Sequence, residues 1–131
     1  MISSLAAVVG VIVAACTFWK SYSRMKQSDQ VKIVHDIMNN KEEKENAIID
    51  TINAEKYEDV ILRYTQYLNV WEWYSFLVNK NQITSPEIIE FYKDTMLKEQ
   101  KEIFAAYPEL NDKNKFKEYR TLCKKLECAD D

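Results

Sequence analysis

The hydrophobic pattern begins with a long uncharged run. No charged side chain occurs from Met1 to Trp19, and all 18 Lys and Arg and all 21 Asp and Glu residues follow it. A helix of about 19 residues is roughly 28 Å long, close to the thickness of the hydrocarbon layer of a membrane. We therefore expect residues 1–19 to form a single transmembrane helix that anchors the chain.

After this run, apolar residues recur every three or four positions, which is the spacing of amphipathic helices. The pattern predicts helices over 20–38, 41–54, 57–78 and 116–126, and a further one that begins near Pro86 and ends before Pro108. Asn39-Asn40 is a predicted stop between the first two, because Asn tolerates left-handed backbone geometry. The start near Pro86 has two possible caps: a capping box of Thr84 and Glu87, or Ser85 with Pro86 at the first helical position.

Turn residues are scarce, with one Gly and two Pro in 131 residues. Strand-and-turn architectures need many more of them. We therefore predict an all-α fold. The transmembrane helix 1–19 is expected to continue through a juxtamembrane helix over 20–40 into a small antiparallel helical bundle over 41–131, with 57–78 as its central helix.

Basic residues near the uncharged run predict its orientation. No Lys or Arg precedes the run, whereas Lys20 and Arg24 follow it closely. Because basic residues favour the cytoplasmic side, we expect the N-terminus outside and the helical domain in the cytoplasm. Trp19 and Tyr22 favour the lipid headgroup level, so these four residues together form the predicted membrane interface.

Small residues within the run suggest a contact with another helix. Ala6, Gly10 and Ala14 recur at intervals of four, a spacing that lets helices approach closely, so a homo-oligomer or a partner subunit is possible through this face. The alternative is that Ala and Gly are simply common in spanning helices. The tetrapeptide that ends at Cys16 also resembles the lipobox of bacterial lipoproteins, which would place the domain outside the cytoplasm. We favour the plain anchor because no basic segment precedes the run.

Composition argues against several functions. The net charge of −3 and the isoelectric point near 5.3 are unsuited to nucleic acid, whose phosphates need a basic face. His35 is the only histidine, and Cys123 and Cys128 point about 140° apart on a helix at 100° per residue, so no metal site or disulfide is expected. Motifs for phosphate loops and nucleophilic catalysis are absent. We predict no enzyme activity, no cofactor and no metal.

The aromatic stretch over 71–76 supplies the candidate interaction site. Glu72 lies between two tryptophans but on the polar side of its helix, so we expect a solvated carboxylate. Trp73 and Phe76 point away from the main apolar stripe. They are therefore predicted to form an exposed surface for a partner protein or the membrane surface.

Three segments resemble a family of small prokaryotic membrane-anchored helical proteins of unknown function. They are YLNVWEWYSFLV at 67–78, ITSPEII at 83–89 and AYPEL at 106–110. The resemblance implies the same topology, an N-terminal anchor followed by a helical domain, and it implies no catalytic or ligand residues.

Together these patterns favour a single-pass membrane protein that contacts lipid and acts as a protein-interaction module or as an accessory subunit of a membrane complex. One alternative is a membrane-anchored domain that binds or senses a ligand in a cavity lined by Tyr64, Trp71 and Phe91. Another is an extracytoplasmic lipoprotein acylated at Cys16.

Overall fold

The computed structural model describes the backbone of residues 2–129 and the side chains of residues 28–129. This part of the chain contains helices and no strand, so the all-α prediction is confirmed. The elements are, in order, α1 (Ile2–Asn53), the short 3-10 helix η1 (Tyr57–Asp59), α2 (Val60–Asn79), α3 (Pro86–Ala106), the short 3-10 helix η2 (Pro108–Leu110) and α4 (Lys117–Ala129).

Helix α1 is one uninterrupted element, so the predicted stop at Asn39-Asn40 is wrong. Ile37 and Ile48 are both buried in the core and lie eleven residues apart, which is close to three turns of the same face. Two mid-helix Asn residues cost only about 0.5–0.7 kcal/mol each relative to Ala, and packing of this face offsets that cost. The charged cluster over 41–45 consequently lies within the helix and not at its positive end.

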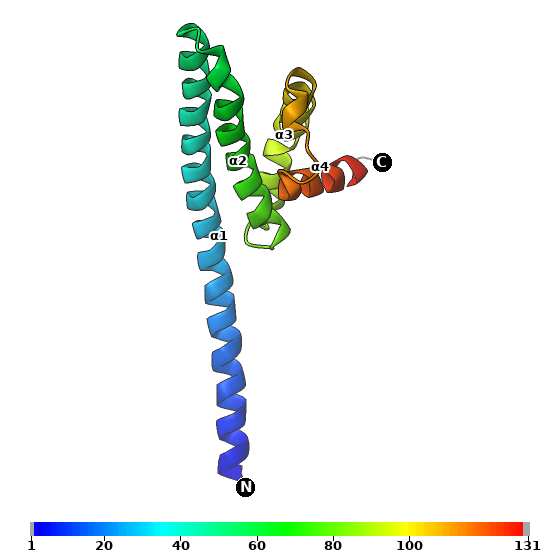
Figure 1. Ribbon diagram of the computed structural model, residues 1–131. Coiled ribbons are helices and arrows are strands. Elements are labelled where there is room, and N and C mark those ends of the chain that lie inside the picture. Colours follow the sequence, from blue (N-terminus) through cyan, green and yellow to red (C-terminus); the bar gives the residue numbers. More distant parts are fainter. Residues whose placement is uncertain (1, 130–131) are drawn as a thin grey trace.

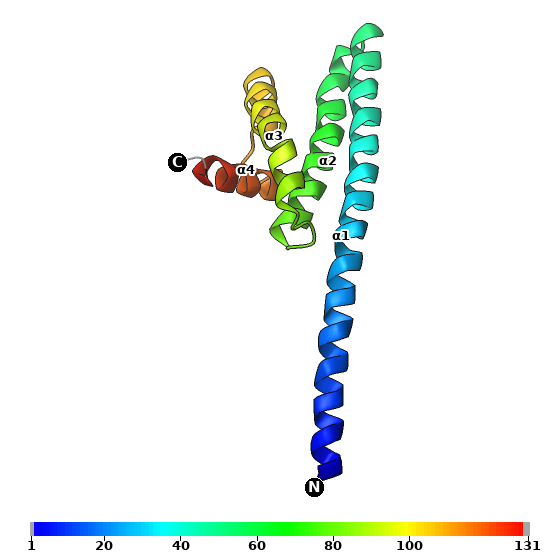
Figure 2. The same cartoon turned by 180° about the vertical axis from the view of Figure 1, so that it is seen from behind.

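The C-terminal half of α1 pairs with α2 as an antiparallel hairpin (Figure 1). At the turn, the Lys56 N–H bonds to the Thr51 carbonyl and the Glu55 N–H to the Ile52 carbonyl, with Glu55 at a φ of 59°. This is a Schellman motif, which satisfies the last carbonyls of α1. The N-terminal half of α1 extends clear of the other helices in both views (Figures 1 and 2).

The loop between α2 and α3 is fastened to α1 by Gln30, whose side chain is almost fully buried. Its Oε1 accepts from the backbone N–H groups of Thr84 and Ser85 at 2.9 and 3.1 Å, and its Nε2 donates to Thr84 Oγ1. Ser85 Oγ accepts from the Ile88 N–H and Pro86 is the first residue of α3, so the second of the two predicted caps is the one present. As predicted, α3 ends before Pro108.

The core lies between the α1–α2 hairpin and the two later helices. Its fully buried side chains include those of Leu68, Trp71, Tyr74, Met96 and Tyr119. The central position predicted for α2 is confirmed, since α2 contacts both α1 and α4. The helices α1, α2 and α3 alternate in direction, whereas α4 lies across α2 and departs from the antiparallel arrangement (Figure 1).

Residues assigned to the membrane lie outside the part of the chain whose side chains are described. They include Ala6, Gly10, Ala14 and Cys16 in the span and Trp19, Lys20, Tyr22 and Arg24 at the predicted interface. Within the residues that are described, no helix has the length and apolar character required to cross a membrane.

Candidate functional site

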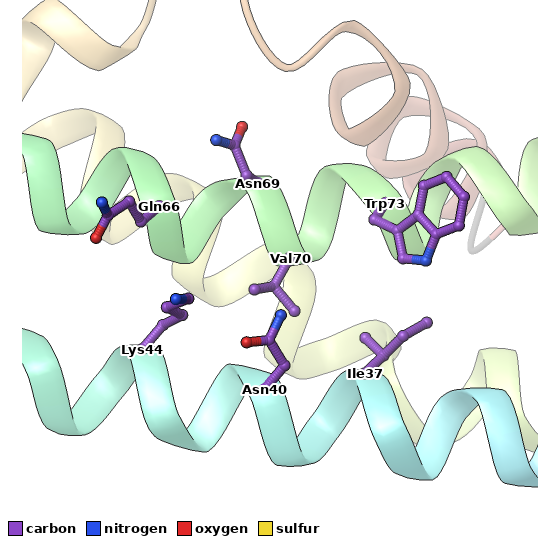
Figure 3. Close-up of a pocket in the computed structure, with 7 residues that line it drawn as sticks. All are labelled: Ile37, Asn40, Lys44, Gln66, Asn69, Val70 and Trp73. Atoms are coloured by element: carbon purple, nitrogen blue, oxygen red, sulfur yellow. The ribbon is translucent and has the colours of Figure 1, made fainter.

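One side of the α1–α2 hairpin carries an open groove (Figure 3). A hollow of about 300 Å³ lies between the helices, with Ile37, Val70 and Trp73 as its apolar lining. The polar residues around them are Asn40 and Lys44 from α1 and Gln66 and Asn69 from α2. The groove thus combines apolar contacts with groups that can donate or accept hydrogen bonds.

Two further hollows share lining residues with this one. Towards the turn it shares Lys44 and Gln66 with a second hollow of about 370 Å³ that reaches Thr51. Towards the α2–α3 loop it shares Asn69 and Trp73 with a third of about 360 Å³, which lies between α2 and α4 and reaches Phe76 and Glu118. Between Ile37 and Thr51 alone, α1 rises roughly 21 Å, or about four helical turns.

Trp73 and Phe76 form a stacked aromatic pair at one end of this groove. Their ring centroids lie 5.5 Å apart with an interplanar angle of 14°. The side chains are 54% and 36% exposed, as their position on the helix predicts. Their role as a partner surface stays a prediction. We call the two hollows between α1 and α2, together with this pair, the hairpin groove.

Glu72 differs from its prediction, because it is not a freely solvated carboxylate. Its two oxygens accept from the backbone N–H groups of Glu118 and Tyr119 at 3.0 and 2.9 Å. These N–H groups belong to the first turn of α4, where helices leave donors without intrahelical partners and favour negative charge. Glu72 therefore caps α4 from α2, and no local sequence motif could indicate a cap that comes from 46 residues away.

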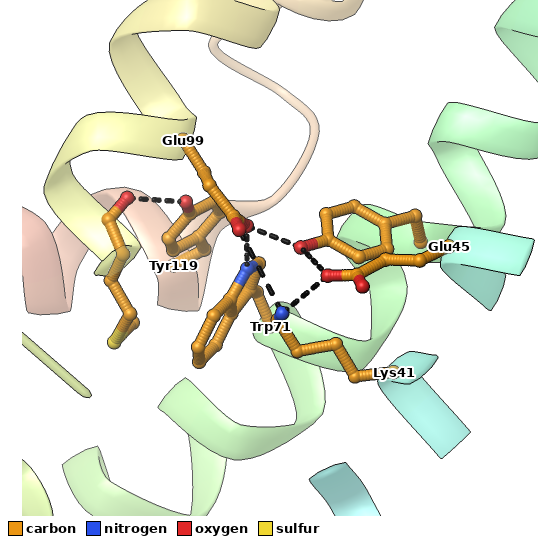
Figure 4. A network of polar contacts seen from close by, with 7 residues as sticks. Lys41, Glu45, Trp71, Glu99 and Tyr119 are labelled. Carbon is orange, nitrogen blue, oxygen red and sulfur yellow. Dashed lines mark hydrogen bonds and ion pairs between the residues drawn. The ribbon is translucent and has the colours of Figure 1, made fainter. Parts of the chain in front are cut away.

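A second feature that sequence patterns missed is a polar cluster at the edge of the core (Figure 4). Glu99 of α3 accepts hydrogen bonds from the Tyr67 hydroxyl and, at 2.7 Å, from Trp71 Nε1. The Lys41 Nζ lies 2.6 Å from Glu45 Oε1 and 3.7 Å from Glu99 Oε1, and 5.4 Å from the Trp71 ring centroid. The cluster joins α1, α2 and α3 through charge-assisted hydrogen bonds.

The hydroxyl groups of the two tyrosines in this region, Tyr67 and Tyr119, act as hydrogen-bond donors. Burial, followed by the hydrogen bond to Glu99 and the negative charges of Glu99 and Glu45, raises the pKa of Tyr67. Burial also raises the pKa of Tyr119, whose hydroxyl donates to the Met96 carbonyl at 2.7 Å. Both phenols therefore stay protonated and act as structural donors between helices.

The histidine and the two cysteines considered as reactive residues do not form a common site. His35 is exposed, Cys123 is buried on the face of α4 that also buries Leu122, and Cys128 is exposed; neither cysteine forms a disulfide. Burial, and next the negative charge of Glu127, raises the pKa of the Cys123 thiol to about 12, so it is unreactive at neutral pH. Among the described residues, no group of His, Cys, Asp and Glu is arranged to hold a metal ion.

The three rings considered for a ligand cavity are in different environments. Trp71 is fully buried and packs against Tyr74, Tyr92 and Tyr119. Tyr64 packs against Tyr107 at a centroid distance of 4.8 Å, and Phe91 is 75% exposed. Phe91 lines an open hollow of about 370 Å³ with Tyr92 and residues of α1, so the three rings do not share one environment, and the ligand-binding alternative stays a prediction.

Comparison with known proteins adds no relative: no family model, curated protein or solved structure matches this chain. The resemblance to the family of small membrane-anchored helical proteins thus stays a prediction.

Proposed function

We propose that this chain is a single-pass membrane protein whose helical domain is a protein-interaction module, and that the hairpin groove binds a helix of its partner. The observation that carries the proposal is the stacked, exposed Trp73 and Phe76 at the end of an open groove. Exposed aromatic surface next to a groove is typical of protein interfaces.

A helix is the occupant that the groove suits best. Two antiparallel helices with an apolar floor and polar edges can receive a third helix, whose apolar face lies in the groove. The floor residues Ile37 and Val70 are already buried, so the partner adds area chiefly on Trp73 and Phe76. Tryptophan at such a position commonly contributes about 2 kcal/mol or more to binding.

The uninterrupted α1 supports the membrane part of the proposal. The uncharged run from Ile2 to Trp19 lies on the same helix as Ile37 and Ile48 of the core, so an anchor there would hold the domain without a flexible linker. Ile37 follows Lys20 by about 17 residues, which is roughly 26 Å of helix. The groove would then face a cytoplasmic partner or the cytoplasmic part of a membrane subunit, while Ala6, Gly10 and Ala14 contact another spanning helix.

The test is purification of the protein from its native membrane in mild detergent, without overexpression, with co-purifying proteins identified by mass. We expect a partner in stoichiometric amount that is lost from the variant Trp73→Ala/Phe76→Ala. Phe91→Ala is the matched control, because Phe91 is an exposed aromatic residue on α3. Recovery of the protein alone, or equal loss from both variants, contradicts the proposed groove.

Topology is tested separately with Cys128, which is exposed. In a variant carrying Cys16→Ser, a membrane-impermeant maleimide should label Cys128 only after the cells are permeabilised. Labelling in intact cells would place the domain outside and favour the lipoprotein alternative. Extraction of the protein by alkaline carbonate would contradict the anchor itself.

A further inference from the structure

A hollow with a cationic lining lies beside α4, away from the hairpin groove. Its volume is about 560 Å³. The charged residues that line it are Lys113, Lys117, Arg120 and Lys124, with Glu127 as the one acid. The local charge is therefore strongly positive in a chain whose net charge is −3.

These positive charges are not neutralised by neighbouring side chains. Lys113, Lys117 and Lys124 are exposed, and none of their side chains makes a hydrogen bond or ion pair within residues 28–129. Arg120 makes its hydrogen bonds to neutral acceptors, the carbonyls of Lys115 and Leu110 and the Asn111 side chain. Four like charges in one hollow repel one another, and an anion would relieve that repulsion.

Arg120 also gives the hollow a fixed element. Its guanidinium lies 4.6 Å from the Phe104 ring centroid, and its Nε lies 2.8 Å from the Lys115 carbonyl oxygen. The positive charge is thus held in place before any ligand arrives, which lowers the ordering cost of binding. The lysines, in contrast, are flexible donors that can adapt to the shape of an anion.

We propose that this hollow binds a small phosphorylated ligand that carries at least two negative charges. Apart from Glu127, the polar side chains that line it can all donate hydrogen bonds, since Gln100 and Thr121 add an amide and a hydroxyl. Ammonium and guanidinium donors match phosphate oxygens, and the volume is within the range of small-molecule sites. The ligand is a free metabolite or a lipid headgroup of the same chemistry.

The test is calorimetric titration of the full chain in micelles of a nonionic detergent, with inorganic pyrophosphate as the probe at about 0.15 M salt. We expect saturable binding at one site and at least a tenfold loss of affinity in Lys117→Gln/Lys124→Gln. The control Lys32→Gln/Lys56→Gln removes the same charge from exposed positions on α1 and in the α1–η1 turn, and should stay within twofold of the parent chain. Equal thermal unfolding of all three proteins ensures that the comparison concerns folded chains.

Two results would overturn the proposal: absence of saturable binding, or equal loss of affinity in both double variants, which would indicate nonspecific attraction. The source of the ligand is distinguished with the protein in lipid nanodiscs. A phosphoinositide included in the disc should weaken pyrophosphate binding if a headgroup reaches the hollow. Unchanged binding would assign the site to a soluble ligand.

Discussion

Replacing Glu99 with Ala tests whether the polar cluster holds the three helices together. The carboxylate accepts from the Tyr67 hydroxyl and from Trp71 Nε1, and it lies 3.7 Å from the Lys41 Nζ. Trp71 is fully buried, and its N–H would lose the carboxylate to which it donates at 2.7 Å. Glu99→Ala should therefore destabilise the protein much more than an average surface substitution does.

The magnitude follows from the contacts. A hydrogen bond to a charged group contributes about 1.5–3 kcal/mol, and Glu99 accepts two of them. Part of this loss of stability is offset in the variant, because the Tyr67 hydroxyl can still donate to Glu45 Oε1 at 3.2 Å and Lys41 keeps its 2.6 Å ion pair with Glu45. We expect Glu99→Ala to lower the free energy of unfolding by about 3–5 kcal/mol, a large share of the roughly 5–15 kcal/mol available to a small domain.

The assay is urea unfolding of the full chain in detergent, followed by circular dichroism. Glu102→Ala is the matched control on the same helix, because Glu102 is mostly exposed and its 4.0 Å pair with Lys98 is worth at most about 0.5 kcal/mol. Glu99→Gln keeps the shape and one acceptor oxygen, so its loss should lie between those of the two Ala variants. If Glu99→Ala were no more destabilising than Glu102→Ala, the cluster would not join the helices as argued.

Other predictions follow from single side chains, each measured by urea unfolding unless stated. Tyr74→Phe should stabilise by about 1 kcal/mol, because the buried Tyr74 hydroxyl has no partner among the described residues; a loss would show an unseen partner. Glu72→Ala should cost about 2 kcal/mol by removing the cap of α4, whereas the exposed control Glu90→Ala should cost less than about 0.5 kcal/mol. A maleimide at pH 7.5 should label Cys128 within minutes and Cys123 only on unfolding; rapid labelling of both would contradict the burial of Cys123. The pKa of Cys123 is about 12 in the folded chain and near 9.0 in the unfolded chain. The contribution of the Cys123 thiol to the free energy of unfolding is therefore fully present below pH 9 and is lost as the pH rises towards 12. Cys123→Ala should make that decline shallower, and an unchanged slope would refute this assignment.

Helical periodicity predicted the features that one helix determines by itself. It identified the exposed side of α2 with Trp73 and Phe76 and the end of α3 before Pro108, and one of the two caps that local motifs offered, the one at Ser85, is present. Each of these depends on neighbours within a few residues along the chain, where spacing translates directly into position.

Contacts between helices were beyond this kind of prediction. Glu72 lies on the polar side of α2, and only the placement of α4 across α2 turns it into a cap. Glu99 likewise has polar neighbours in sequence, and its partial burial depends on Tyr67 and Trp71 from another helix. The error at Asn39-Asn40 has the same origin, because a weak local stop was overridden by packing of α1 on α2.

The two sides of the hairpin differ in a way that supports the proposed groove. On the core side, α3 and α4 cover Trp71 and Tyr74 completely, and the polar groups there are largely paired with one another. On the groove side, Trp73 keeps 54% of its surface exposed although Ile37 and Val70 beside it are buried. Stacking on Phe76 returns only about 0.5–1.5 kcal/mol to the folded chain, much less than full burial of both rings would. A partner helix that covers Trp73 and Phe76 would therefore obtain the largest part of its binding free energy by burying these two rings, which contribute little to the stability of the isolated domain.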